Sequence, residues 1–154
     1  MEVTKQNLNT TLWVKPGVIE KTRKWHVVDA AGMTLGRLAV EITKKLIGKH
    51  KGFFCDFWDS GDYVVVTNAA KITVTGNKMK EKMYYKHSGY KGHLKETPLW
   101  MLMQKHPEDA LMFAIKGMLP KNKQRAVRLK RLKIFKDAEH SYKHLSLEPL
   151  AING

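Results

Sequence analysis

Cysteine is almost absent from the sequence: Cys55 is the only one among 154 residues. No disulfide can form within the chain and no cysteine-rich zinc cage can be built, which fits a protein of a reducing compartment. No apolar run approaches the roughly 20 residues that cross a bilayer. The segment Met1–Asn7 lacks the hydrophobic stretch of a secretory signal. We therefore expect a soluble, cytoplasmic protein.

Catalytic and cofactor-binding motifs are missing as well. In the segment 32–37 three residues separate the two glycines and Arg37 follows, whereas a phosphate-binding Walker loop needs four residues and then Lys-Ser/Thr. None of the seven histidines forms an HExxH pair, and no serine lies in a GxSxG turn. Asp59 and Asp62 are interpreted as turn-forming residues. We expect no enzymatic activity, cofactor, metal or small-molecule substrate.

Acidic residues are scarce, with 14 against 28 lysines and arginines, for a net charge of +14. The imbalance is concentrated: residues 71–136 hold seventeen basic and four acidic side chains, and half of the sixteen residues in 121–136 are basic with none acidic. Such a segment repels itself unless a polyanion lies against it. A phosphate backbone is the expected polyanion, because binding it releases condensed counterions. The alternative is that these basic side chains form an ordinary protein surface that contacts only water.

The pattern of apolar residues predicts an α/β domain at 25–136, between an N-terminal arm at 1–24, with Trp13 and Val14 docking on the domain, and an extended tail at 137–154. Strands are predicted at 25–29, 63–67, 71–75, 82–87 and 133–135. A helix is predicted from Thr34 to a stop at Gly48, a short one from Thr97-Pro98, and another from Pro107 with Met118 and Leu119 in the core. A partial helix is expected in the basic segment.

Lysines, tyrosines and glycines alternate in the segment 76–93. Glycine lets backbone N–H groups approach phosphate, and tyrosine stacks on unpaired bases. The alternative is a strand and a surface loop whose tyrosines lie partly in the core. His50, His87 and His93 either donate to phosphate or simply face solvent. The candidate RNA-binding residues here are Lys78, Lys80, Lys82, Tyr84, Tyr85, Lys86, His87, Tyr90 and Lys91.

The second candidate surface follows a bend at Gly117 and Pro120. We expect Arg125, Arg128 and Arg131 to face solvent and grip phosphates bidentately, while lysines act as point charges. The candidates are Lys116, Lys121, Lys123, Arg125, Arg128, Lys130, Arg131 and Lys133, together with Arg37 from the helix predicted after Thr34 and Lys49, His50 and Lys51 from the loop that follows it. Cations spread over several loops favour folded RNA over DNA.

Ordered blocks of sequence carry a resemblance to a known family. The blocks are Trp25–Ala30, Thr34–Ala39, Gly48–Lys51, Ser60–Val66, Asn68-Ala69, Val74–Lys78, Tyr84-Tyr85, His87–Gly89 and Lys116–Lys121. Over about residues 13–145 the chain resembles the bacterial large-subunit ribosomal protein thirteen family.

This resemblance implies a three-layer α/β/α domain with a short, mainly parallel sheet. It also implies a structural, non-catalytic role: binding large-subunit rRNA early in assembly, beside neighbouring ribosomal proteins, with 75–92 and the segment after 118–120 against RNA. Two other functions remain open. An RNA-processing enzyme or free RNA chaperone would use Asp59, Asp62 and the histidines. A protein lying on anionic membrane is disfavoured, because the helices from 34 and 107 have narrow apolar stripes.

Overall fold

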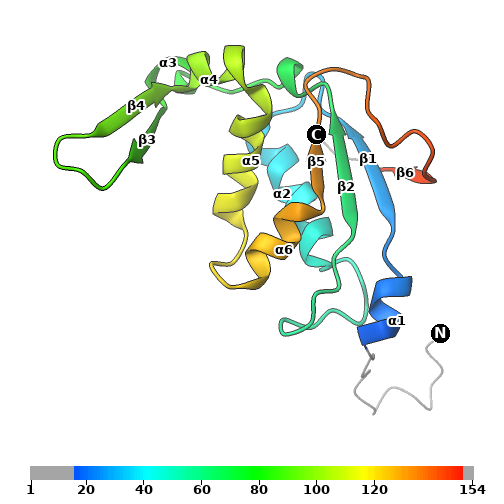
Figure 1. Ribbon diagram of the computed structural model, residues 1–154. Helices are drawn as coiled ribbons and strands as arrows, with labels where there is room; N and C mark the ends of the chain where they lie inside the picture. The colour runs from blue at the N-terminus through cyan, green and yellow to red at the C-terminus, as the bar shows by residue number, and fades with distance from the viewer. Residues whose placement is uncertain (1–15, 151–154) are drawn as a thin grey trace.

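Four short parallel strands form the central sheet (Figure 1). The computed structural model describes residues 16–150. The strand order is β5 (Leu132–Ile134), β2 (Tyr63–Thr67), β1 (Trp25–Asp29) and β6 (Leu147–Pro149), and each neighbouring pair is parallel. β2 is central and buried on both faces, as its unbroken apolar sequence predicts. The predicted α/β class with a mainly parallel sheet flanked by helices is confirmed.

Helices and a separate hairpin complete the structure. The helices are α1 (Pro16–Lys21), α2 (Leu35–Ile47), α3 (Lys78–Glu81), α4 (Leu99–Lys105), α5 (Pro107–Met118) and α6 (Gln124–Lys130), with a 3-10 turn, η2, at Ala69–Lys71. The hairpin strands are β3 (Met83–His87) and β4 (Leu94–Pro98). No helix among residues 16–150 is long and apolar enough to span a bilayer.

The hydrophobic core lies between the sheet and the helices α2 and α5, which Figure 1 shows beside each other. The predicted stripe of α2 is buried, with Leu38 and Ile42 fully inaccessible, and packs with Val64 and Val66 of β2. Gly48 ends α2 in the left-handed conformation, with φ of 90°, as predicted. The helix predicted from Pro107 is also confirmed, and its Leu111 and Ile115 join the core.

Aromatic side chains gather on the opposite face of the sheet. Trp25 of β1 stacks on Tyr63 of β2 with ring centroids 4.3 Å apart, and Tyr142 packs on Trp25 at 5.2 Å. Phe135 contacts Tyr142 in turn. The C-terminal segment is therefore attached to the domain, and β6 adds an edge strand to the sheet where the sequence predicts only an extended tail. A three-residue strand is too short to give a periodic signal.

Three sequence predictions are wrong. Residues 71–75 do not form a strand: β1 and β5 already occupy both edges of β2, so this segment makes only a single bridge, Thr34–Thr73. Met118 is 42% exposed, although Leu119 is buried as expected. Residues 16–21 form α1 where an irregular arm is predicted. Trp13 and Val14 lie outside the described residues.

The hairpin of β3 and β4 projects away from the sheet, joined to it through α3 and α4 (Figure 1). The extended conformation predicted for residues 82–87 is confirmed, whereas β4 is not predicted. Its register pairs Tyr84 with Thr97 and Lys86 with Lys95. The hairpin contributes little to the core, because most of its side chains are exposed.

Gly61 sits where the start of β2 meets the end of α2. A Cβ atom at Gly61 would lie 1.8 Å from the carbonyl oxygen of Leu46, so the two backbones require glycine here. We predict that Gly61→Ala lowers the free energy of unfolding by about 3 kcal/mol, because neither backbone can move without disturbing the core. Urea denaturation measures this change.

Gly117→Ala is the matched control, because a Cβ at Gly117 would meet no atom within 4 Å. The Gly117→Ala control should leave the free energy of unfolding unchanged or raise it by up to about 1 kcal/mol, since alanine favours the helix. Equal stability of the Gly61→Ala variant and the native chain would contradict the close approach.

Candidate nucleic-acid interface

The projecting hairpin and α3 carry a set of exposed cations and aromatic rings. Tyr85 is 64% exposed and Tyr90 is 75% exposed, which is far more than core tyrosines show. The exposed candidates in this region are Lys78, Lys80, Lys82, Tyr85, Lys86, His87, Tyr90 and Lys91. Gly89 and Gly92 have positive φ values of 96° and 79°, so the loop depends on glycine to turn. This surface offers both charge and ring faces.

Two lysines stand directly opposite each other in the hairpin. Lys86 of β3 pairs with Lys95 of β4, so their side chains share one face of the hairpin. Like charges at such a position destabilise a strand pair, and a bound polyanion would remove the repulsion. The sequence alone does not single out Lys95, because only the register of the unpredicted strand β4 places it beside Lys86.

Tyr84 anchors the hairpin instead of facing outward. Its ring lies 5.4 Å from the ring of Phe113 on α5, and the ammonium of Lys82 lies 5.4 Å from its centroid. Burial raises the pKa of the Tyr84 phenol. Tyr84 thus matches the alternative in which some tyrosines of this segment are partly buried, while Tyr85 and Tyr90 remain available for stacking.

The second cationic surface is divided between exposed lysines and buried arginines. Around the bend and along α6 the exposed candidates are Lys116, Lys121, Lys123 and Lys130, and Arg125 and Lys133 are partly exposed. Arg128 and Arg131 are only 1% and 4% exposed. The expectation that these two arginines face solvent is therefore wrong.

Asp59 explains the burial of these arginines. Arg131 makes a bidentate ion pair with Asp59, its Nη2 donating to Oδ1 at 2.6 Å and its Nη1 to Oδ2, and Nη2 also donates to the Leu46 carbonyl at 3.1 Å. Arg23 and Arg128 approach the same carboxylate at 3.6 and 3.7 Å. Burial alone would raise the pKa of Asp59, but hydrogen bonds and charge from Arg131, with the charges of Arg23 and Arg128, outweigh it and lower the pKa.

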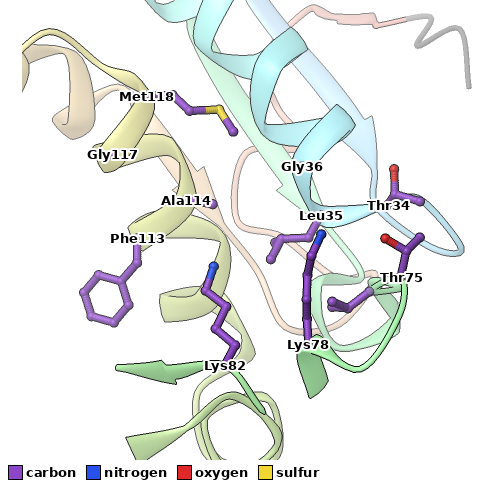
Figure 2. A pocket seen from close by; sticks show the side chains of 11 residues that line it. Thr34, Leu35, Gly36, Thr75, Lys78, Lys82, Phe113, Ala114, Gly117 and Met118 are labelled. Carbon is purple, nitrogen blue, oxygen red and sulfur yellow. The ribbon is translucent and has the colours of Figure 1, made fainter. Parts of the chain in front are cut away.

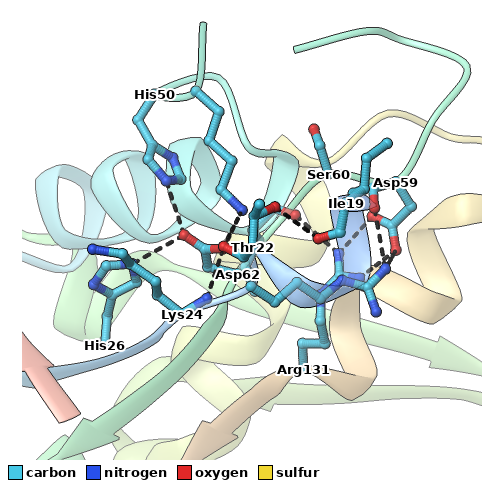
Figure 3. A network of polar contacts seen from close by, with 12 residues as sticks. Ile19, Thr22, Lys24, His26, His50, Asp59, Ser60, Asp62 and Arg131 are labelled. Atoms are coloured by element: carbon cyan, nitrogen blue, oxygen red, sulfur yellow. Dashed lines mark hydrogen bonds and ion pairs between the residues drawn. The ribbon is translucent and has the colours of Figure 1, made fainter. Parts of the chain in front are cut away.

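Asp62 is the centre of a second buried network (Figure 3). Lys51 donates to Oδ1 at 2.5 Å and the Lys24 backbone N–H to the same oxygen at 3.1 Å. His26 and His50 lie 3.1 and 2.9 Å from Oδ2. Burial opposes ionisation of Asp62, yet hydrogen bonds from His26, Lys51 and Lys24 hold its pKa well below the ordinary value.

This network changes the interpretation of several candidate residues. Lys51 is largely buried against Asp62 and is not free to bind phosphate, whereas Arg37, Lys49 and His50 are exposed, with 26% of the His50 side chain accessible. The pKa of the His50 imidazole is lowered by burial and by the charge of Lys45. Asp59 and Asp62 are ion-pair acceptors, so the interpretation of both as turn-forming residues is wrong. No local signal reveals these partners, because most lie dozens of residues away in the chain.

His26, His50 and Asp62 form the only group of three potential metal ligands within residues 16–150, with ligand atoms within 4.8 Å of one another. The Lys51 ammonium on the same carboxylate would repel a cation. The chemistry of the cluster therefore favours a structural ion pair that ties β1 and the loop after α2 to the start of β2.

A pocket of about 360 Å³ opens between α2 and α5, beside α3 (Figure 2). Figure 2 shows Lys78 and Lys82 reaching into the opening from below, while Leu35 and Met118 point into it from the two helices. Thr34 and Thr75 stand at one rim. The pocket thus joins two cations to an apolar wall.

Comparison with known proteins identifies similar chains. The family model for Ribosomal protein L13 matches residues 23–141. The large ribosomal subunit protein uL13 of Nitratidesulfovibrio vulgaris is 51% identical over 130 residues, covering 84% of this chain and 90% of its own. The protein of the same name from Thermotoga maritima is 46% identical over 142 residues, covering 92% and 94%. That of Desulfitobacterium hafniense is 50% identical over 133 residues, covering 86% and 92%.

Changing Arg131 to methionine should lower the stability of the protein, whereas the same change at Arg125 should have almost no effect. Arg131→Met leaves Asp59 without its bidentate partner in a poorly hydrated position, and we predict a loss of about 3 kcal/mol in the free energy of unfolding. Arg125→Met should change stability by less than about 0.5 kcal/mol, because its side chain is partly exposed. Denaturant titration of both variants measures the difference. Equal stability of the two variants would show that the Asp59 pair is not structural.

The lowered pKa of Asp62 predicts a loss of stability in acid. A carboxylate whose pKa is lower in the folded state contributes fully above its ordinary value of 3.8, and the contribution is lost as the pH falls through the lower folded pKa. Asp62→Asn should cost at least about 2 kcal/mol at pH 7 and should flatten the decline in unfolding free energy between about pH 5 and pH 2.

The exposed Asp56→Asn variant is the control and should follow the native curve. Urea titrations at several pH values measure these free energies. An unchanged pH profile in Asp62→Asn would contradict the network.

Proposed function

Because this chain belongs to the ribosomal protein L13 family, we propose that it is a structural constituent of the large ribosomal subunit that binds large-subunit rRNA and supports early assembly of the subunit. The role is structural and not enzymatic. Its partners are the rRNA and neighbouring large-subunit proteins, and its location is the ribosome in the cytoplasm.

The observation that carries the proposal is the uncompensated charge of the hairpin. The lysines of α3, β3 and the following loop are exposed and have no ion pair among residues 16–150. The facing pair Lys86 and Lys95 adds a repulsion that folding does not relieve. Phosphates placed against this surface would relieve it and would release counterions, so binding is favoured by entropy and weakened by salt.

The exposed rings favour RNA as the partner. Tyr85 and Tyr90 lie among the lysines of a projecting element, where unpaired bases of folded RNA can stack on them. The exposed lysines around the bend and along α6 form a second surface for phosphate, supported from below by the buried Arg128 and Arg131.

The RNA-processing alternative is disfavoured, because the two aspartates it would use for catalysis are held in ion pairs. Asp59 is held by Arg131, and Asp62 is held by Lys51 together with His26 and His50. A carboxylate whose oxygens already accept several charged hydrogen bonds is a poor general base or metal ligand. These residues serve the fold, which leaves binding as the function that the surface supports.

Sedimentation of cell extract tests the proposal. We expect the chain to migrate with the large subunit in stoichiometric amount through moderate salt, and to be released by ribonuclease. A variant with Lys80, Lys86 and Lys91 changed to Gln should dissociate at lower salt, and the slope of log affinity against log salt for isolated rRNA should flatten by about two to three.

A triple variant at Lys21, Lys44 and Lys143 is the control. It removes the same charge from exposed positions outside the hairpin and should leave the slope close to that of the native chain. If most copies of the native chain are found free in the soluble fraction, the proposal is refuted.

A further inference from the structure

We propose that the pocket between α2 and α5 binds a single unpaired nucleotide of the RNA, with its phosphate at Lys78 and Lys82 and its base against the apolar wall. This inference rests on the proposed function and specifies how one part of the RNA is held.

The charge of the pocket fits a phosphate. The ammonium groups of Lys78 and Lys82 enter from the same side (Figure 2) and have no ion-pair partner in the described part of the chain. No acidic side chain lines the pocket. Two lysines that line one pocket without a counter-charge repel each other, and a phosphate bound in the pocket would reduce the repulsion.

The apolar wall fits a base. Met118 and Phe113 are 42% and 43% exposed although they belong to α5, whose other face is in the core. Together with Leu35 and Ala114 they line the pocket next to its cations. A phosphate alone would leave this wall exposed to water, whereas a base stacked against it would remove apolar area from solvent.

The size and rim of the pocket also fit a nucleotide. Its volume of about 360 Å³ falls within the roughly 300–1,000 Å³ of small-ligand sites. The hydroxyl of Thr34 makes no capping hydrogen bond to α2, and Thr75 stands beside it. These two hydroxyls can bond a base edge or a ribose 2′-hydroxyl, and the contact to the 2′-hydroxyl distinguishes RNA from DNA.

Gly117 gives a way to close the pocket without changing charge. It lines the pocket, and a Cβ atom placed there meets no atom within 4 Å, so the helix backbone leaves room for a leucine side chain to extend into the open space of the pocket. Gly117→Leu should keep the melting temperature, since it also replaces a helical glycine. Gly117→Ala is the matched control, because it adds one methyl group and leaves the pocket largely open.

The full chain is tested in two ways. NMR titration with adenosine and uridine 5′-monophosphate should shift the backbone amide signals of Gly36 and Gly117, with millimolar affinity. Inorganic phosphate should bind more weakly. Gly117→Leu should abolish the shift of the Gly36 signal and lower affinity for large-subunit rRNA about tenfold, with the slope against salt unchanged because no charge is removed. Lys78→Gln with Lys82→Gln should lower the slope by about two.

The outcomes separate this inference from the function on which it rests. Native rRNA affinity in a folded Gly117→Leu variant would overturn the inference while leaving rRNA binding intact. If monophosphates bind but rRNA affinity is unchanged by Gly117→Leu, the pocket takes free nucleotides and the RNA assignment is overturned. Failure of the native chain to bind rRNA at low salt would instead refute the proposed function, and the inference with it.

Discussion

The ion pair between Asp59 and Arg131 is the contact on which the arrangement of this protein depends. It joins the loop before β2 to the residue before β5, and Arg131 also bonds the end of α2 through the Leu46 carbonyl. Three elements distant in sequence thus meet at one guanidinium, with Gly61 in contact beside it. Removing Asp59 would leave Arg131 without an anionic partner in a place that water scarcely reaches, and removing Arg131 would take away the bidentate partner of Asp59.

This contact also divides the cations of the chain into two classes. Arg128, Arg131 and Lys51 are neutralised inside by Asp59 and Asp62, whereas the lysines of the hairpin and of the bend are exposed without acidic partners. Asp59 and Asp62, just before β2, hold these buried cations and so stabilise the fold. The later surface has excess positive charge that an external polyanion could neutralise. Its arginines Arg128 and Arg131 are buried, so its exposed lysines are the side chains that can reach a ligand.

The sequence predicts the helices and strands that have a clear local signal, such as a repeated apolar pattern or a residue that starts or ends a helix. The stripe of α2 and the stop at Gly48, the β-branched run of β2, and Pro107 at the start of α5 all have local physical causes. Prediction from sequence fails where the structure of a segment depends on which strand edges are open for pairing. Residues 71–75 have strand-forming residues, but β1 and β5 cover both edges of β2, and the segment makes only one bridge, to Thr34. β6 is too short to give a periodic signal, yet it pairs with the edge of β1.

The sequence by itself determined that the chain is cationic in its later half, that it folds as α/β layers, and that its motifs resemble one family, because charge counts and periodicity are local properties. Only the tertiary structure decided which cations are free. Whether an arginine faces solvent depends on a carboxylate up to 72 residues away, as Arg131 and Asp59 demonstrate. The facing lysines of the hairpin and the pocket beside α3 likewise arise from register and packing, which no single segment encodes.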